Sequence, residues 1–161
     1  MDSKGRAVSE NRTDRVTSGL IEEGYRVEPA RLNPSPWSMI IGTAVVGFDR
    51  ARITYRVEAG GAVIHVLFYE LLQPAGSLRN SFAGFVGFLD WLATRPVGIE
   101  RLQGAVHSLV ADGDRALSTE RIARYYKQIL CGRTLEWRDG QEVIYTEIAS
   151  WRQFRGIRAF P

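Results

Sequence analysis

The stretch NSFAGFVGFLDWLATR, residues 80–95, decides the fold of this chain. Its apolar side chains recur at helical spacing and cover almost the whole circumference, which predicts a helix that is buried on more than one side. These side chains are Phe82, Phe85, Val86, Phe88, Leu89, Trp91 and Leu92. Asn80 is suited to cap the amino end, because its side chain can accept a hydrogen bond from a free backbone N–H. Pro96 ends the helix at Arg95, because the residue before a proline is pushed out of helical geometry.

Apolar and alternating segments on both sides of this helix predict a sheet. Residues 39–48 are apolar and rich in β-branched side chains, residues 52–58 alternate between apolar and polar, and residues 63–71 are apolar on both faces. The last of these is expected at the centre of the sheet, because it has no polar face to turn to water. Gly60-Gly61 supplies the tight turn before it. Residues 99–110 are predicted to form a further strand.

Two more helices are predicted from amphipathic patterns. One spans residues 14–23 and ends at Gly24, and the other spans residues 119–131 and ends at Gly132. The side chains expected to face inward are Val16, Leu20 and Ile21 in the first helix and Ile122, Tyr125, Tyr126 and Ile129 in the second.

The dipeptide Asp139-Gly140 is the strongest turn signal of the chain and predicts a hairpin between residues 133–138 and 141–148. The side chains expected to face one another across it are Leu135 and Trp137 on one strand and Val143 and Tyr145 on the other. The element order is then α-β-β-β-α-β-α-β-β. It predicts an α+β fold, with a mostly antiparallel sheet packed against two main helices.

Composition divides the chain into three parts. Residues 1–18 are polar and are predicted to be disordered, residues 19–150 form a single domain, and residues 151–161 form an aromatic and basic tail. A single cysteine, Cys131, excludes an internal disulfide and suits a reducing compartment. Neither a signal peptide nor an apolar run long enough to span a membrane is present. We therefore expect a cytoplasmic protein.

The residues that most often carry catalysis do not form a recognisable pattern. His65 and His107 have no cysteine or carboxylate at metal-ligand spacing. Cys131 falls at the carboxyl end of a predicted helix, where the helix dipole raises the pKa of a thiol. The glycine-rich segments match no phosphate-binding motif. The sequence therefore predicts no enzyme, no cofactor and no metal.

The tail WRQFRGIRAF, residues 151–160, is the candidate binding segment, because apolar side chains alternate with arginines and no acid intervenes. The candidate partner-binding residues are Trp151, Arg152, Phe154, Arg155, Ile157 and Arg158. Such a segment can dock into an acidic partner, stack on nucleic acid or lie on an anionic membrane. Alternatively, its aromatic side chains pack on the protein's own sheet while the arginines face water. Gly156 argues against a helix here and therefore against membrane binding.

Four segments resemble the low-calcium-response protein R (LcrR) family. They are LIEEGYRVEP, ARITYRVE, LRNSFAGFVGFLDWL and ALSTERIARYYKQILCG, and the resemblance spans residues 20–148. It implies a small cytosolic regulator of a bacterial type III secretion system, which adjusts the expression or secretion of other components by binding a protein. The implied partner is a small regulator, a chaperone or an export substrate, and a homodimer is compatible with it. The resemblance assigns no functional residues.

Two alternatives stay open at this stage. The first is a secretion chaperone that holds an extended segment of an export substrate at the edge formed by residues 133–148. The second is a nucleic-acid-binding regulator that uses the arginines of the tail. The net charge of +3, carried by 19 arginines and two lysines against 18 acids, is too small to indicate nucleic acid by itself.

Overall fold

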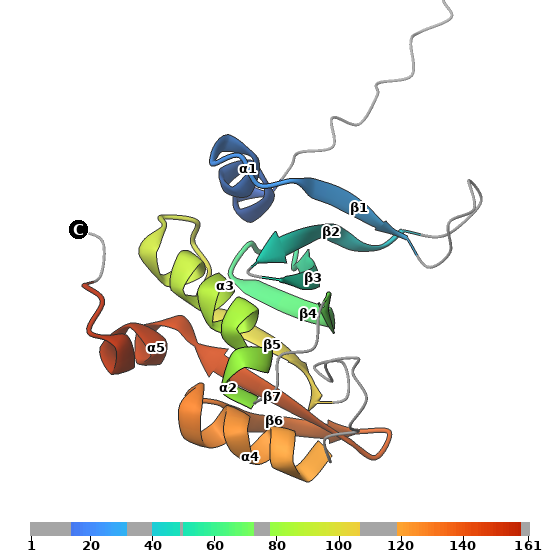
Figure 1. The fold of residues 1–161 in the computed structure, drawn as a ribbon, viewed down its shortest axis with the longest axis vertical. Helices are drawn as coiled ribbons and strands as arrows, with labels where there is room; N and C mark the ends of the chain where they lie inside the picture. The colour runs from blue at the N-terminus through green and yellow to red at the C-terminus, as the bar shows by residue number, and fades with distance from the viewer. Residues whose placement is uncertain (1–13, 32–39, 49, 73–77, 107–118, 159–161) are drawn as a thin grey trace, which may run out of the picture.

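The computed structural model describes residues 14–31, 40–48, 50–72, 78–106 and 119–158. The strands are β1 (Val27–Arg31), β2 (Ile40–Phe48), β3 (Ala51–Val57), β4 (Val63–Leu71), β5 (Arg101–Ala105), β6 (Arg133–Arg138) and β7 (Gln141–Glu147). The helices are α1 (Arg15–Glu22), α2 (Leu78–Ser81), α3 (Ala83–Thr94), α4 (Thr119–Ile129) and α5 (Ile148–Arg155). Figure 1 shows the helices gathered against the sheet, with α1 at the end near β1 and α4 at the end near β6.

The strands form one sheet in the order β1-β2-β3-β4-β5-β7-β6. Neighbouring strands are antiparallel except for β4 and β5, which run parallel because α2 and α3 cross between them. The predicted α+β class with a mostly antiparallel sheet is therefore confirmed. So is the central position of β4. The predicted element order omits β1 and α5, which carry weaker local signals.

The central helix is present but broken. α2 ends at Ser81 and α3 begins at Ala83, so Phe82 rather than Asn80 precedes the main helix, and no side chain caps it. The predicted Asn80 cap is wrong because Asn80 lies inside α2. At the break, the buried carbonyl of Ser81 accepts a hydrogen bond of 2.6 Å from the hydroxyl of Tyr69 on β4. Arg95 is extended, as the following proline predicts.

α3 is buried on more than one side, as its pattern predicts. Phe85, Phe88, Leu89, Trp91 and Leu92 all belong to the core. Aromatic rings join the layers: Phe88 packs on Tyr55 of β3, and Phe85 packs on Tyr126 of α4 at a centroid distance of 5.1 Å. This cluster of aromatic residues fixes α3 between the sheet and the other helices.

Two predicted core positions lie in solvent instead. Ile21 of α1 and Ile129 of α4 are exposed, so these predictions are wrong. In α4 the inward side is shifted around the helix, and Ala123 and Leu130 are buried in addition to the predicted Ile122 and Tyr126. Packing against the sheet sets the rotation of α4 about its own axis, and this rotation decides which of its side chains are buried.

The N-terminal helix begins at Arg15, inside the segment 1–18 that composition predicts to be disordered; residues 1–13 lie outside the described part. Asp14 caps α1, because its carboxylate accepts a hydrogen bond of 2.8 Å from the backbone N–H of Thr17. The Thr17 hydroxyl lies 2.7 Å from the buried hydroxyl of Tyr55. α1 is thereby attached to the sheet.

The predicted hairpin joins β6 and β7. Asp139 and Gly140 both have positive φ, at 51° and 76°, as a tight turn of this type requires. A β-bulge between Thr134 and Glu136 leaves Leu135 as the extra residue. The predicted pairing of Leu135 and Trp137 with Val143 and Tyr145 is therefore wrong. The residues opposite Val143 and Tyr145 are instead Glu136 and Arg133, and Trp137 lies opposite Glu142.

Candidate functional site

His65 lies on the face of the sheet away from the helices, between the buried Ile64 and Val66. Its Nε2 is 2.6 Å from the Glu58 carboxylate, and its Nδ1 is 3.3 Å from the side-chain amide of Gln103. With that amide donating to Nδ1, Nε2 carries the hydrogen and donates it to Glu58. These contacts join His65 of β4 to Glu58, which follows β3, and to Gln103 of β5, so they support the sheet.

Cys131 is half-buried and directly follows the last turn of α4, with a positive φ of 56°. Burial raises the pKa of its thiol, and the nearby positive charge of Arg133 opposes this only in part. The thiol is therefore held in its unreactive form. Within the described residues, no three His, Cys, Asp or Glu side chains could hold a metal ion. His107 lies outside those residues.

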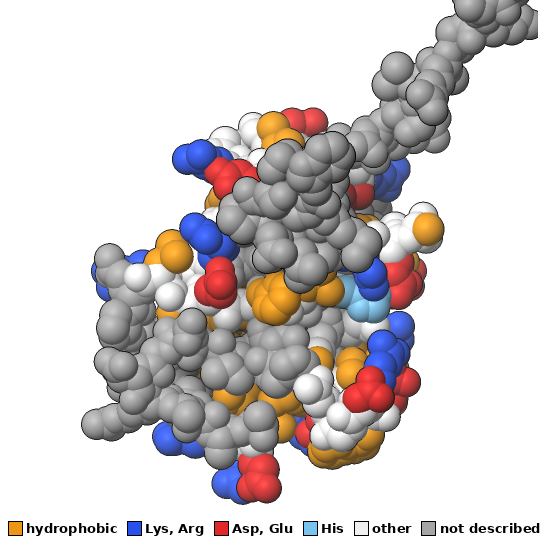
Figure 2. Space-filling model, turned by 90° about the vertical axis from the view of Figure 1, so that its right-hand side faces the viewer, with side chains coloured by type: hydrophobic (Ala, Val, Ile, Leu, Met, Phe, Trp, Pro, Cys, Tyr) orange, Lys and Arg blue, Asp and Glu red, His pale blue; other side chains and the backbone are white. Residues whose placement is uncertain are grey.

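Ion pairs with carboxylates are formed by Arg26, Arg52, Arg95, Arg138 and Arg155. Arg52 of β3 lies opposite Glu70 of the neighbouring strand β4, and Arg138 forms an ion pair with Glu136 of the same strand. On the face drawn in Figure 2, the Lys and Arg side chains of the described residues lie interspersed with Asp and Glu side chains.

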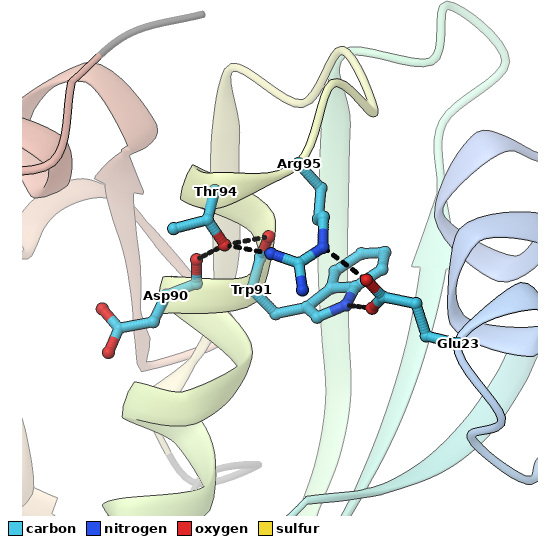
Figure 3. A network of polar contacts seen from close by, with 5 residues as sticks. All are labelled: Glu23, Asp90, Trp91, Thr94 and Arg95. Atoms are coloured by element: carbon cyan, nitrogen blue, oxygen red, sulfur yellow. Dashed lines mark hydrogen bonds and ion pairs between the residues drawn. The ribbon is translucent and has the colours of Figure 1, made fainter.

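Glu23 joins α1 to α3 (Figure 3). Its carboxylate accepts hydrogen bonds from the indole N–H of Trp91 and from Nε of Arg95, the latter at 2.5 Å. These two donors, Trp91 first, lower the pKa of Glu23. Arg95 also donates to the Thr94 hydroxyl, which in turn donates to the carbonyl of Asp90. The network is structural: the bonds to Glu23 hold α1 to α3, and the bonds of Thr94 orient Arg95 at the end of α3.

Residues 151–155 of the predicted tail belong to the helix α5, which packs on α3, and residues 159–161 lie outside the described part. Trp151 is only 1 % exposed, and its indole N–H donates to the Asp90 carboxylate at 2.9 Å. Nε of Arg152 donates to the carbonyl of Ala93, also at 2.9 Å. Gly156 ends the helix with a positive φ, so it acts as a helix stop rather than excluding a helix.

The other four predicted tail residues divide into two groups. Arg155 forms an ion pair with Asp90 at 2.8 Å, and Ile157 is half-buried against the core. The hydrogen bond from Arg155 to Asp90 raises the pKa of the guanidinium. Phe154, 58 % exposed, and Arg158 face solvent. Most of the candidate binding segment therefore contributes to the fold.

A more open surface lies at the far end of the sheet. β6 is an edge strand, and all six of its residues are exposed. Trp137 is 67 % exposed, and Leu135 is exposed as well. We call the residues 133–138 the β6 edge. The sequence predicts this hairpin as a possible edge, but the bulge that sets Trp137 opposite Glu142 is not revealed by the local pattern.

A small hollow of about 110 Å³ lies beside Trp137, where the β6–β7 turn meets α4. Val106, Ala123 and Trp137 form its apolar wall, and the carboxylate residues Glu120 and Glu142 also line it. Glu142 accepts hydrogen bonds from Lys127 of α4 and from the Thr134 hydroxyl, the latter at 2.6 Å. Burial opposes the ionisation of Glu142, but these hydrogen bonds outweigh it and lower its pKa. α4 is thereby attached to the hairpin.

The family model of the type III secretion system regulator LcrR matches residues 13–156. This chain belongs to the LcrR family. The resemblance noted in the four sequence segments is therefore confirmed. Searches among curated proteins and among solved structures found no match. No helix in the described part of the chain is long and apolar enough to cross a bilayer.

The extent of the LcrR match agrees with the architecture. It begins next to Asp14, the cap of α1, and it ends at Gly156, the stop of α5. The LcrR region thus includes α5 with Trp151, which packs in the core, whereas Ile157 and Arg158 lie beyond it. Both the β6 edge and α4 lie inside the region.

Proposed function

We propose that this LcrR-family regulator acts in the cytoplasm by binding a protein of the type III secretion apparatus. Through that binding it controls the expression or secretion of other components, without enzymatic activity of its own. The exposed β6 edge with Trp137 is the observation that carries the proposal. An exposed edge strand presents unpaired backbone N–H and C=O groups, which can pair with a strand of another chain. The exposure of this edge therefore favours a role in binding.

The absence of a catalytic arrangement among the described residues is consistent with this role. His65 is held by Glu58 and Gln103, and the thiol of Cys131 is kept neutral by burial. In the described part of the chain, the hydrogen-bond partners of His65 include no nucleophilic Ser, Thr or Cys side chain.

Nucleic-acid binding is the weaker alternative. Phosphate recognition needs several unpaired cations on one face, since each contact replaces a counterion. In this chain Arg95 and Arg155 are paired with carboxylates, and Arg152 donates to a backbone carbonyl. The arginines of the tail are thus largely engaged inside the protein.

A chaperone for an export substrate is a second candidate, and the same edge favours it. A protein that holds an extended segment can do so by adding that segment to an open strand, and β6 offers one. The two candidates differ in the fate of the bound protein. A chaperone binds a protein that is later exported, whereas a regulator binds one that stays in the cell.

The experiment is an affinity capture of the tagged full-length chain from its own cells, at low and at high salt, followed by mass spectrometry. A single apparatus protein retained at high salt supports the proposal, because a mainly apolar contact persists there. Its presence or absence in the secreted fraction separates a chaperone from a regulator. Recovery of nucleic acid alone, lost at high salt, would contradict protein binding. The tag alone is the control.

A further inference from the structure

We propose that the β6 edge binds an extended, acidic segment of the protein partner as an additional strand, with one aliphatic side chain of that segment in the hollow beside Trp137. This inference rests on the proposed function and adds to it the place and the chemistry of the bound segment.

The two edges of the sheet differ in their capacity to accept a strand. β1 contains Pro29, which has no backbone N–H to donate, and its pairing with β2 is irregular around Ala30. β6 has no proline, and its whole length is exposed. In a hairpin closed by a two-residue turn, the pair next to the turn is hydrogen bonded, and alternate residues point their backbone groups outward. Because Arg138 lies next to the turn, we expect Trp137 to point its backbone N–H and C=O away from β7.

The side chain of Trp137 adds an apolar contact to this edge. It lies on the same side of the sheet as α4, and together with Ala123 it borders the hollow of about 110 Å³. An added strand would direct alternate side chains toward α4. An aliphatic side chain in the hollow would cover part of the indole, which is otherwise 67 % exposed. Partly exposed tryptophans of this kind often provide most of the binding energy of an interface.

Charge determines which kind of segment fits. Arg138 is paired with Glu136, and Lys127 is paired with Glu142. Arg133, at the start of β6, and Arg124, one turn before Lys127 on α4, are exposed and form no ion pair with a described residue. The unpaired guanidinium of Arg133 on the edge itself, with that of Arg124 on α4, favours carboxylates in the added segment near the start of β6. Glu120 and Glu142 line the hollow and disfavour a carboxylate there, which agrees with an aliphatic side chain at that position.

The same charges disfavour a second copy of this chain as the added strand. Arg133 and Arg138 lie at opposite ends of β6, so antiparallel pairing of two copies brings arginines of both copies together. Like charges directly opposite one another destabilise a strand pair. An acidic segment from a different protein avoids this repulsion.

The first step of the test locates the bound segment. A photoreactive amino acid replaces Leu135 in the full-length chain, the complex is cross-linked in the source cells, and the attached peptide is sequenced. A second chain carries the photoreactive residue at Phe154, which is exposed on the helix α5. We expect cross-links from position 135 to a stretch of the protein partner that is rich in Asp and Glu. Cross-links from position 154 alone, or to residues 133–138 of a second copy, would overturn it.

The second step uses a synthetic peptide of the cross-linked stretch as the probe. Strand addition predicts that the peptide slows hydrogen exchange of the Trp137 amide. Trp137→Ala and Arg133→Glu should each weaken peptide binding at least tenfold. The matched tail variants Phe154→Ala and Arg158→Glu should leave it unchanged within twofold. Circular dichroism and thermal unfolding check that each variant is folded. If Trp137→Ala does not fold, Arg133→Glu tests the proposal in its place.

The outcomes separate this inference from the proposed function. If a protein partner is captured but the tail variants lose binding while the β6 variants keep it, the edge assignment is wrong and protein binding stands. If the peptide binds without slowing exchange at Trp137, strand addition is wrong. If no protein partner is captured at all, the proposed function fails, and the assignment of its site fails with it.

Discussion

The indole N–H of Trp151 donates a hydrogen bond of 2.9 Å to the carboxylate of Asp90, 61 positions earlier in the chain. The same carboxylate forms an ion pair with Arg155, whose guanidinium lies 5.6 Å from the Trp151 ring. One acid on α3 thus holds two residues of α5. A segment with the composition of a binding tail is therefore part of the core.

This relationship predicts a large loss of stability when Trp151 is truncated. Trp151→Ala should lower the free energy of unfolding by about 3–5 kcal/mol, because it leaves a cavity in the core. Its neighbour Phe154 is exposed, so Phe154→Ala should change the free energy by less than about 0.5 kcal/mol. Urea denaturation of both variants measures this. Equal effects of the two substitutions would show that α5 is not anchored through Trp151.

Truncating a buried side chain of α3 is expected to lower the free energy of unfolding by a similar amount. Phe85 is fully buried and contacts both Tyr69 and Tyr126. Phe85→Ala should therefore destabilise the protein by about 3–5 kcal/mol. The exposed Ile129 of α4 is the control, because Ile129→Ala should have little effect. A loss below about 1 kcal/mol for Phe85→Ala would disprove its place in the core.

Gly104 on β5 predicts a steric effect. A Cβ at this position would lie 2.9 Å from the backbone carbonyl oxygen of Val66, which cannot move without disturbing β4. Gly104→Ala should thus cost about 1–3 kcal/mol. At Gly60, where a Cβ would meet no atom within 4 Å, the same substitution should be neutral or stabilise by up to about 1 kcal/mol. Thermal unfolding of the two variants gives the comparison.

The contacts of Glu23 predict a pH dependence. Hydrogen bonds from Trp91 and Arg95 lower the pKa of its carboxyl below the ordinary value of 4.5, so folding favours the ionised form. Its contribution to stability is present above the unfolded-state pKa and is lost as the pH falls through the lowered, folded-state value.

Urea midpoints of the parent chain and of Glu23→Gln, measured from pH 7 down to pH 3, test this. The parent chain should be the more stable one at neutral pH, and the difference should shrink in acid. Glu120→Gln, on the exposed side of α4, controls for general effects of removing an acid. A difference that stays constant with pH would argue against the ionised Glu23 contact.

Short-range signals predicted those parts of the fold that depend on neighbouring residues in the chain. The positive φ values of Asp139 and Gly140 follow from a dipeptide, and the burial of Ile53 and Tyr55 in β3 follows from the two-residue period of a strand. Thr54, predicted on the polar face, is buried instead. The continuous apolar character of α3 predicted that it is buried on more than one side.

The tertiary structure decided what depends on distant neighbours. The break at Phe82, the bulge at Leu135 and the rotation of α4 that buries Leu130 each reflect packing against another layer. The candidate binding site that we propose is the β6 edge rather than the predicted tail, because packing against α3 buries Trp151 of the tail. By itself, the sequence determined the α+β class, the strands β2 to β7, the hairpin and the family resemblance. It could not show that Trp151 is buried and Trp137 exposed, because both are tryptophans beside arginines, and only the partners folded against them distinguish the two.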